Sequence, residues 1–218
     1  MLTFKPIRHG DDTMAFRDLL HGVDCDDDAV SVNLEMFDRA SASGGKGVVF
    51  NDIIESPGHR AALDVLVRDR LCEVFSVSPG ELIDVLAWGM ANPEPPLVVD
   101  STEAEVLQCR QEPVDLQKIP IPRHYQEDAG RYQSASVIIA EYDGIRNMSY
   151  HRQLLRGKRH CVARFVPRHL RTMYEKASAN GDEVPIAVVN GADATVLLAA
   201  AMSFNEDLDE LTVAAALH

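Results

Sequence analysis

Two short segments in the second half of the chain contain side chains that could bind a cation and a carboxylate. Residues 146–152 read RNMSYHR, and residues 167–170 read PRHL. The amide oxygen of Asn147 and the imidazole of His169 suit a manganese-like ion, which binds oxygen and nitrogen ligands. The guanidinium of Arg152 is always charged and can bind a carboxylate through two parallel hydrogen bonds. Together these residues predict half of a cofactor site.

Each of these residues also has a simpler interpretation. Asn147 follows a turn signal and can be only a turn residue, and Arg152 can be a surface or ion-pair arginine on a strand. His169 in a first helical turn can face solvent or cap the helix. We expect His151 to support the site or the fold and not to bind the metal.

The composition favours a small molecule or another protein as the partner. Acidic side chains number 34 against 21 Lys and Arg, a formal net charge of -13, whereas a nucleic-acid partner requires a basic face. The four cysteines form no CxxC pair, which argues against a zinc or redox site and fits a reduced compartment. No window approaches the roughly 18 apolar residues of a membrane span. We therefore expect a soluble, cytoplasmic protein without a membrane span.

Capping and turn signals predict the elements of the first 96 residues. Helices are predicted over residues 33–42, 61–71 and 78–88, and a short strand over residues 47–51. The third helix begins with a capping-box pattern, in which Glu81 follows Ser78 by three residues. The run PEPP at residues 93–96 breaks helicity and indicates a domain boundary.

The remainder of the chain predicts several strands and then an alternation of strand and helix. Strands are predicted over residues 97–100, 105–109, 134–142, 147–155, 159–166 and 185–190, and helices over 169–179 and 194–202. Gly181 is expected to end the first of these helices. The turn signal Asp143-Gly144 predicts a hairpin after residue 142. The apolar run at 185–190 indicates a buried strand. The segment 209–218 turns apolar from Leu211 to Leu217 and then stops, with neither a cap nor a closing strand after it.

Several segments taken together resemble the UbiD-like decarboxylases. They are LQKIPIPRHYQEDAGRYQSASVIIA from Leu116, NMSYHR from Asn147, VPRHL from Val166, PIAVV from Pro185, ADATVLLAAA from Ala192 and SPGELIDVLAWGMANPEPPLVVD from Ser78. The resemblance covers the chain from about Gly44 onward. The combination of motifs is specific, although any one of them alone would be weak.

The resemblance implies a fold and an activity. The expected class is α/β (α+β), with a small N-terminal α/β domain over residues 1–96 and a split β-barrel flavin-binding domain over residues 97–218 that is incomplete in this chain. The implied activity is non-oxidative, often reversible decarboxylation of an unsaturated or aromatic carboxylic acid. Its cofactors are prenylated FMN, a divalent Mn2+ or Mg2+ ion and, in some members, K+.

The same resemblance implies roles for particular residues. Asn147 and His169 correspond to two ligands of the divalent ion, and Arg152 to the catalytic arginine of a Glu-Arg-Glu set. The predicted cofactor-binding residues are Met148, Ser149, Tyr150, His151, Arg152 and Arg168.

In the family, a third metal ligand and both catalytic glutamates follow the point that matches Leu217. By motif, no glutamate of this chain takes those roles. Three interpretations are open: a natural half of a split enzyme, a fragment of a longer protein, or a stand-alone homologue that has lost catalysis. We therefore expect an isolated chain without decarboxylase activity, an oligomer, and missing glutamates that are carried by a companion polypeptide or by a missing C-terminal part. The alternative is a non-catalytic flavin-binding or interaction subunit of the same fold.

Overall fold

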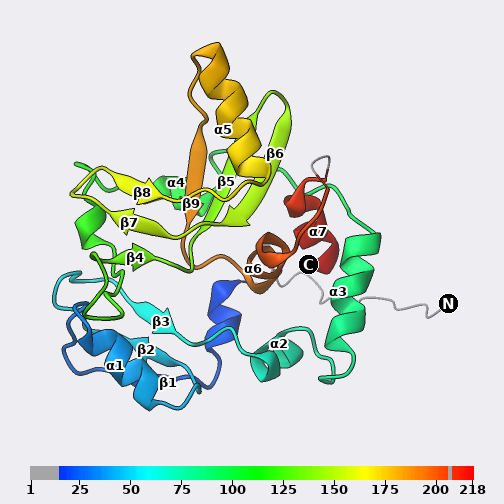
Figure 1. The fold of residues 1–218 in the computed structure, drawn as a ribbon. Coiled ribbons are helices and arrows are strands. Elements are labelled where there is room, and N and C mark those ends of the chain that lie inside the picture. Colours follow the sequence, from blue (N-terminus) through cyan, green and yellow to red (C-terminus); the bar gives the residue numbers. More distant parts are fainter. Residues whose placement is uncertain (1–14, 206–207) are drawn as a thin grey trace.

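The computed structural model describes residues 15–205 and 208–218, which form three small sheets flanked by helices (Figure 1). The strand orders are β1-β2-β3, β4-β7-β8 and β6-β5-β9. In the described part of the chain none of these sheets closes into a barrel, which agrees with the expected α/β (α+β) class and an incomplete barrel domain. Among the described residues, no helix has the length and apolar character to cross a membrane.

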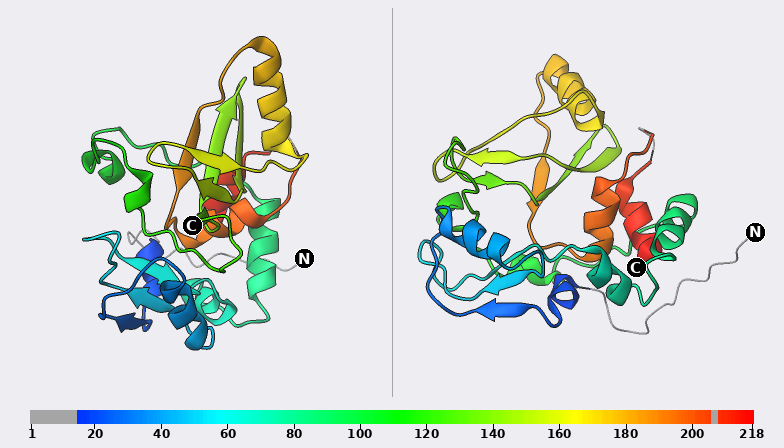
Figure 2. Two further views of the ribbon diagram at one scale, coloured as in Figure 1. Left: turned by 60° about the vertical axis from the view of Figure 1, so that its left-hand side comes forward. Right: turned by 60° about the horizontal axis from the view of Figure 1, so that its bottom comes forward.

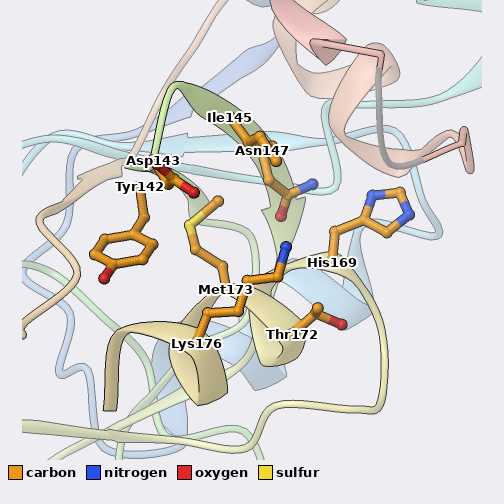
Figure 3. A pocket seen from close by; sticks show the side chains of 8 residues that line it. All are labelled: Tyr142, Asp143, Ile145, Asn147, His169, Thr172, Met173 and Lys176. Atoms are coloured by element: carbon orange, nitrogen blue, oxygen red, sulfur yellow. The ribbon is translucent and has the colours of Figure 1, made fainter. Parts of the chain in front are cut away.

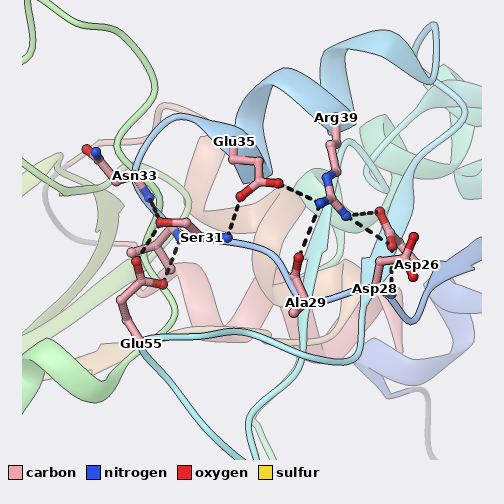
Figure 4. A network of polar contacts seen from close by, with 9 residues as sticks. Asp26, Asp28, Ala29, Ser31, Asn33, Glu35, Arg39 and Glu55 are labelled. Atoms are coloured by element: carbon pink, nitrogen blue, oxygen red, sulfur yellow. Dashed lines mark hydrogen bonds and ion pairs between the residues drawn. The ribbon is translucent and has the colours of Figure 1, made fainter.

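The N-terminal sheet packs against one helix. Its elements, with the 3-10 helix that precedes it, are η1 (Phe16–Leu20), β1 (Asp24–Asp26), α1 (Glu35–Ala42), β2 (Val48–Phe50) and β3 (Ala61–Leu63). The helix predicted over 33–42 and the strand over 47–51 are confirmed. Arg39 on α1 donates to both carboxylate oxygens of Asp26 and to the carbonyl of Ala29 (Figure 4). These contacts anchor α1 to β1.

The helix predicted over residues 61–71 is wrong in its first half. Residues 61–63 form β3, which pairs antiparallel with the buried strand β2, and the helix α2 (Arg68–Val74) begins only later. Pairing with a strand distant in sequence outweighs the local apolar spacing. The next helix, α3 (Leu82–Ala91), is confirmed with its capping box, because Ser78 donates from both its backbone nitrogen and its hydroxyl to Glu81 Oε2, at 2.9 and 2.6 Å.

The two strands predicted between residues 97 and 109 are wrong. Residues 97–100 have no regular structure, and the following segment forms the short helix α4 (Glu105–Gln108). A strand needs a neighbour to satisfy its backbone groups, and no described segment pairs with this one. Its apolar side chains are therefore left outside, with Leu97 and Val98 90% and 88% exposed. The 3-10 helix η2 (Leu116–Lys118) follows.

The hairpin predicted around Asp143-Gly144 is confirmed. It joins β5 (Val137–Tyr142) to β6 (Ile145–Tyr150), and the central residues have φ of 54° and 73°, as tight hairpins require. On its other side β5 pairs antiparallel with β9 (Ile186–Val189). The expected burial of this last strand is wrong, since β9 is an edge strand and Ile186 is 51% exposed.

The strand predicted over residues 147–155 is two strands in two different sheets. The second sheet contains β4 (Tyr132–Gln133), β7 (Gln153–Leu155) and β8 (Cys161–Ala163), paired antiparallel. His151 and Arg152 lie between β6 and β7, where the chain passes from one sheet to the other.

Three helices complete the fold: α5 (His169–Asn180), α6 (Ala194–Ala201) and α7 (Glu210–Leu217). Gly181 ends α5 in the left-handed conformation with φ of 77°, as predicted. Asp193 caps α6, and Asp209 caps α7 by accepting from the backbone nitrogen of Leu211 at 2.9 Å.

The largest apolar core joins both parts of the chain. The helices α6, α7 and α3 lie side by side in two further views (Figure 2), and Gly89 on α3 is close to Leu217 on α7. The same core contains Leu19 and Leu71 from the N-terminal part together with Met148 on β6. The predicted domain boundary at residues 96 and 97 remains a prediction.

Candidate cofactor and metal site

The hairpin positions Asn147 on a buried face of the β6-β5-β9 sheet. Asn147 pairs with Ala140 on β5 and is only 4% exposed. Alternation along a strand places Asn147 and Ser149 on one face and Met148 and Tyr150 on the other. The latter two side chains are buried in or packed against the large core. The polar face of β6 is thus separate from its core face.

His169 and Asn147 line the same pocket. His169 is the first residue of α5, and the pocket also contains Tyr142, Asp143, Ile145, Thr172, Met173 and Lys176. Figure 3 shows the Asn147 amide and the His169 ring facing one another across it, with the Lys176 amine reaching towards them from α5. The structure therefore brings together the two residues that were predicted as metal ligands.

A carboxylate that sequence reasoning missed also contacts Asn147. Glu210, the first residue of α7, is 3% exposed. Its Oε1 accepts from Asn147 Nδ2 and its Oε2 accepts from the backbone nitrogen of Met148, both at 2.8 Å. This second bond uses the open edge of β6. The signal that could have found Glu210 is the pair Asp209-Glu210, a helix cap and an acidic first residue directly before an apolar run.

The environment of Glu210 is unfavourable for an isolated negative charge. Burial raises the pKa of its carboxyl group, while hydrogen bonding from Met148 and the charge of His169 act in the opposite direction. Among the described residues no basic side chain forms an ion pair with Glu210, because Arg146 pairs with Glu141 and Asp209 instead. A bound cation would offset the cost of burying this carboxylate.

The donor set fits a divalent cation of the manganese or magnesium type. An amide oxygen, an imidazole nitrogen and a carboxylate oxygen are the ligand types that such ions accept. In the described part of the chain there is no group of three or more His, Cys, Asp or Glu side chains suited to a metal. The set of Asn147, His169 and Glu210 contains only two side chains of those types, because its third donor is the amide of Asn147.

The two predicted arginines lie outside this pocket. Arg152 is exposed in the segment between β6 and β7, and no described residue forms a hydrogen bond or ion pair with its guanidinium. Arg168 is also exposed and is the N-cap residue of α5, whose first-turn amides receive no side-chain cap. Free amides at a helix N-terminus favour a negatively charged group such as a phosphate.

The predicted flavin-lining residues divide between the two faces of β6. Met148 is buried in the large core, and the Tyr150 hydroxyl donates to the carbonyl of Leu197 at 3.0 Å. Burial raises the pKa of Tyr150 to about 12. Ser149 and His151 remain on the polar side, where burial lowers the pKa of His151 and a hydrogen bond with the backbone of Arg164 opposes that shift. The side chains of Met148 and Tyr150 therefore lie on the opposite face of β6 from Asn147 and Ser149.

The fold and the site define a class of protein. The family model described as the UbiD 3-octaprenyl-4-hydroxybenzoate carboxy-lyase Rift-related domain matches residues 98–218, which is more than half of the chain. The chain belongs to the UbiD family, whose members include decarboxylases that depend on prenylated FMN.

Curated relatives and solved structures agree with this assignment. The chain is 34% identical over 154 residues to an anhydromevalonate phosphate decarboxylase of Methanosarcina mazei, covering 70% of this chain and 35% of the relative. A second enzyme of that name, from Aeropyrum pernix, is 41% identical over 105 residues, covering 48% of this chain and 24% of that enzyme. An evolved dimeric form of the UbiD-class enzyme HmfF from Pelotomaculum thermopropionicum, in complex with prenylated FMN, superposes with a TM-score of 0.89 at 28% identity.

The similarity extends over only part of each relative. The HmfF superposition covers 94% of this chain and 51% of that enzyme. A vanillic acid decarboxylase of Sedimentibacter hydroxybenzoicus shows the same fold, with a TM-score of 0.85 at 17% identity and coverage of 94% and 48%. The chain thus spans about half the length of its solved relatives and about a third of the M. mazei enzyme.

Proposed function

We propose that this chain is part of a non-oxidative decarboxylase that uses prenylated FMN and a divalent Mn2+ or Mg2+ ion. The proposal is carried by one observation: Asn147 shares a pocket with His169 and is hydrogen-bonded to the buried carboxylate of Glu210. These three side chains come from β6, α5 and α7, which are far apart in sequence. A purely structural role does not require an amide, an imidazole and a buried carboxylate to converge.

The three donors would hold the divalent ion, and the N-terminus of α5 would contribute to binding the cofactor phosphate. Arg168 lies at that helix end, next to His169, which shares a pocket with Asn147 on β6. An HmfF structure in complex with FMN, 28% identical with a TM-score of 0.85, supports a flavin cofactor. When bound, the cofactor supplies the electron sink for cleavage of the carbon-carbon bond. A potassium ion beside the phosphate remains a prediction.

Arg152 would bind and orient the substrate carboxylate. Its guanidinium has no partner among the described residues, so both of its parallel donors are available. The carboxylate leaves as neutral carbon dioxide, so a charge-assisted contact holds the substrate before cleavage and weakens afterwards. Proton transfer would require a carboxylic acid beside Arg152. No described carboxylate forms an ion pair with Arg152.

We propose an unsaturated carboxylic acid as the substrate, with an aromatic acid as the less favoured class. The curated relatives carry the name anhydromevalonate phosphate decarboxylase, which describes a dehydrated, phosphorylated acid. The solved relatives include a vanillic acid decarboxylase, but at 17% identity it supports only the fold.

A companion polypeptide would complete the site and supply the proton-transfer glutamates. The structure exposes apolar side chains in two places that no described segment covers, the segment with Leu97 and Val98 and the edge strand β9 with Ile186 and Val188. Exposed apolar patches and open strand edges mark surfaces at which another chain binds. The same surfaces would favour oligomers.

The alternative is a non-catalytic flavin-binding subunit. The observation in its favour is that no described carboxylate accompanies Arg152. Such a subunit would bind flavin and metal without turnover, even together with its partners.

Co-expression with a flavin prenyltransferase tests the proposal. The purified chain, alone and with a candidate companion, is examined by absorption spectroscopy and metal analysis, in parallel with the His169→Ala variant. We expect flavin and manganese in the unchanged chain, less of both in the variant, and decarboxylation only with the companion. Absence of bound flavin under every partner condition would refute the cofactor assignment. Robust turnover by the chain alone would contradict the need for a companion.

A further inference from the structure

A continuous line of hydrogen bonds runs along the polar face of β6. Glu210 Oε1 accepts from Asn147 Nδ2 at 2.8 Å, and Asn147 Oδ1 accepts from the hydroxyl of Ser149 at 3.0 Å. The same hydroxyl oxygen lies 3.1 Å from Nε2 of His151. The line therefore connects the carboxylate at the metal site to a buried imidazole at the end of the strand.

Both ends of the Asn147 carboxamide are held. A carboxamide can rotate and exchange the positions of its oxygen and nitrogen, which have opposite hydrogen-bonding roles. Glu210 accepts only from the nitrogen and the Ser149 hydroxyl donates only to the oxygen, so the two contacts select the same orientation. A carbonyl oxygen has two lone pairs, and the Ser149 bond uses one of them. The second remains available to a cation in the pocket shared with His169.

His151 lies directly beside the hydroxyl of Ser149. The hydroxyl oxygen is 3.1 Å from Nε2 of the ring, and which of these two atoms donates depends on the ring tautomer. The ring is itself fixed, because it is 8% exposed and packs edge-on against Phe165 with a centroid distance of 5.2 Å. Neither Ser149 nor His151 lines the pocket of Asn147 and His169.

From this geometry we infer that Ser149, supported by His151, is a positioning residue that fixes the Asn147 carboxamide with its oxygen towards the cation. The inference rests on the proposed function, since it assumes that Asn147 is a ligand. Residues that orient a metal ligand typically change metal affinity by about 10–100-fold when they are replaced. Ser149 acts through Asn147 and not by touching the ion.

Manganese binding by the whole chain tests this role without any catalytic measurement. Titration with Mn2+, followed by electron paramagnetic resonance of the free ion, is compared for Ser149→Ala, Ser149→Thr and His151→Phe. We expect affinity to fall about tenfold or more in Ser149→Ala. It should recover to near the original value in Ser149→Thr, which keeps the hydroxyl, and fall less in His151→Phe, which keeps the packing against Phe165.

Ser136→Ala is the matched control. Ser136 is more deeply buried than Ser149, at 1% exposed, and its replacement loses one comparable hydrogen bond, from Gln153 Nε2 at 3.0 Å, but it does not contact Asn147. Its manganese affinity should stay unchanged. Equal affinity of Ser149→Ala and the original chain would overturn the positioning role, as would an equal loss in Ser136→Ala. If the original chain and His169→Ala bind Mn2+ equally, the proposed metal site is refuted. This outcome differs from the results that would refute only the positioning role of Ser149.

Discussion

The carboxamide of Asn147 and the carboxylate of Glu210 form a buried hydrogen bond of 2.8 Å across 63 positions of sequence. The contact exists because the capped N-terminus of α7 packs at the open edge of β6, where Glu210 also accepts from the backbone of Met148. An acidic side chain at 3% exposure without a basic partner among the described residues is costly. The proposed cation would offset this cost.

Glu210→Gln should remove most of the stabilisation that manganese gives to the fold. A ligand at 100 times its Kd stabilises a protein by about 2.7 kcal/mol. When Mn2+ is added at about 100 times its Kd, the unfolding free energy of the original chain should rise by about that amount. The rise should be much smaller in the variant, because the amide lacks the negative charge. Urea unfolding with and without Mn2+ measures the rise in both proteins. Glu175→Gln, an exposed carboxylate on α5 that pairs with Arg171, serves as the control. An equal gain in Glu210→Gln would exclude Glu210 as a ligand.

Sequence reasoning succeeded where the signal is local. The Asp143-Gly144 turn, the Gly181 cap and the capping box at Ser78 each depend on residues within a few positions of one another. Two residues of the pocket, Asn147 and His169, were found through motifs on the hairpin and at the start of α5.

Sequence reasoning failed where the local structure depends on contacts between segments that are far apart in sequence. Residues 61–63 are a strand because β2 lies beside them, and residues 97–100 are not a strand because no described segment does. Glu210 escaped notice for the same reason, since its importance arises only when α7 meets β6. Arg152 lies between β6 and β7 and does not line the pocket of Asn147 and His169, and its catalytic role stays a prediction.

Gly89→Ala should destabilise the contact between α3 and α7. Alanine is favoured over glycine in a helix by about 1 kcal/mol. A Cβ at this position, however, would lie 2.6 Å from Cδ2 and 2.7 Å from Cγ of Leu217. Overpacking of this kind costs about 1–3 kcal/mol, so a net loss of about 1 kcal/mol is expected in chemical denaturation.

The double variant Gly89→Ala with Leu217→Ala separates this clash from other effects. Contacting residues are non-additive, and the smaller side chain leaves room for the new methyl group. The double variant should therefore lose less stability than the two single changes added together. Strict additivity would show that the two helices adjust without strain.

Acid should weaken the fold partly through Glu81. Hydrogen bonds from the side chain and then the backbone of Ser78 lower the pKa of this exposed carboxyl group. A lowered pKa in the folded state means that the contribution is fully present above the unfolded pKa of about 4.3 and is lost as the pH falls through the folded value. Glu81→Gln should flatten the acid limb of a plot of unfolding free energy against pH. Identical acid limbs for the two proteins would contradict the capping role.

Replacing Leu97 and Val98 together by serine should reduce association without weakening the fold. The two side chains are 90% and 88% exposed, so they contribute almost no buried apolar area within the chain. Surface substitutions of this kind change stability by less than about 0.5 kcal/mol. If these residues bind a companion or a second copy, sedimentation velocity should show a smaller associated fraction for the double variant. A matched pair at Ala62 and Leu63, inside β3, should instead lower stability. Unchanged association in the Leu97 and Val98 variant would place the contact surface elsewhere.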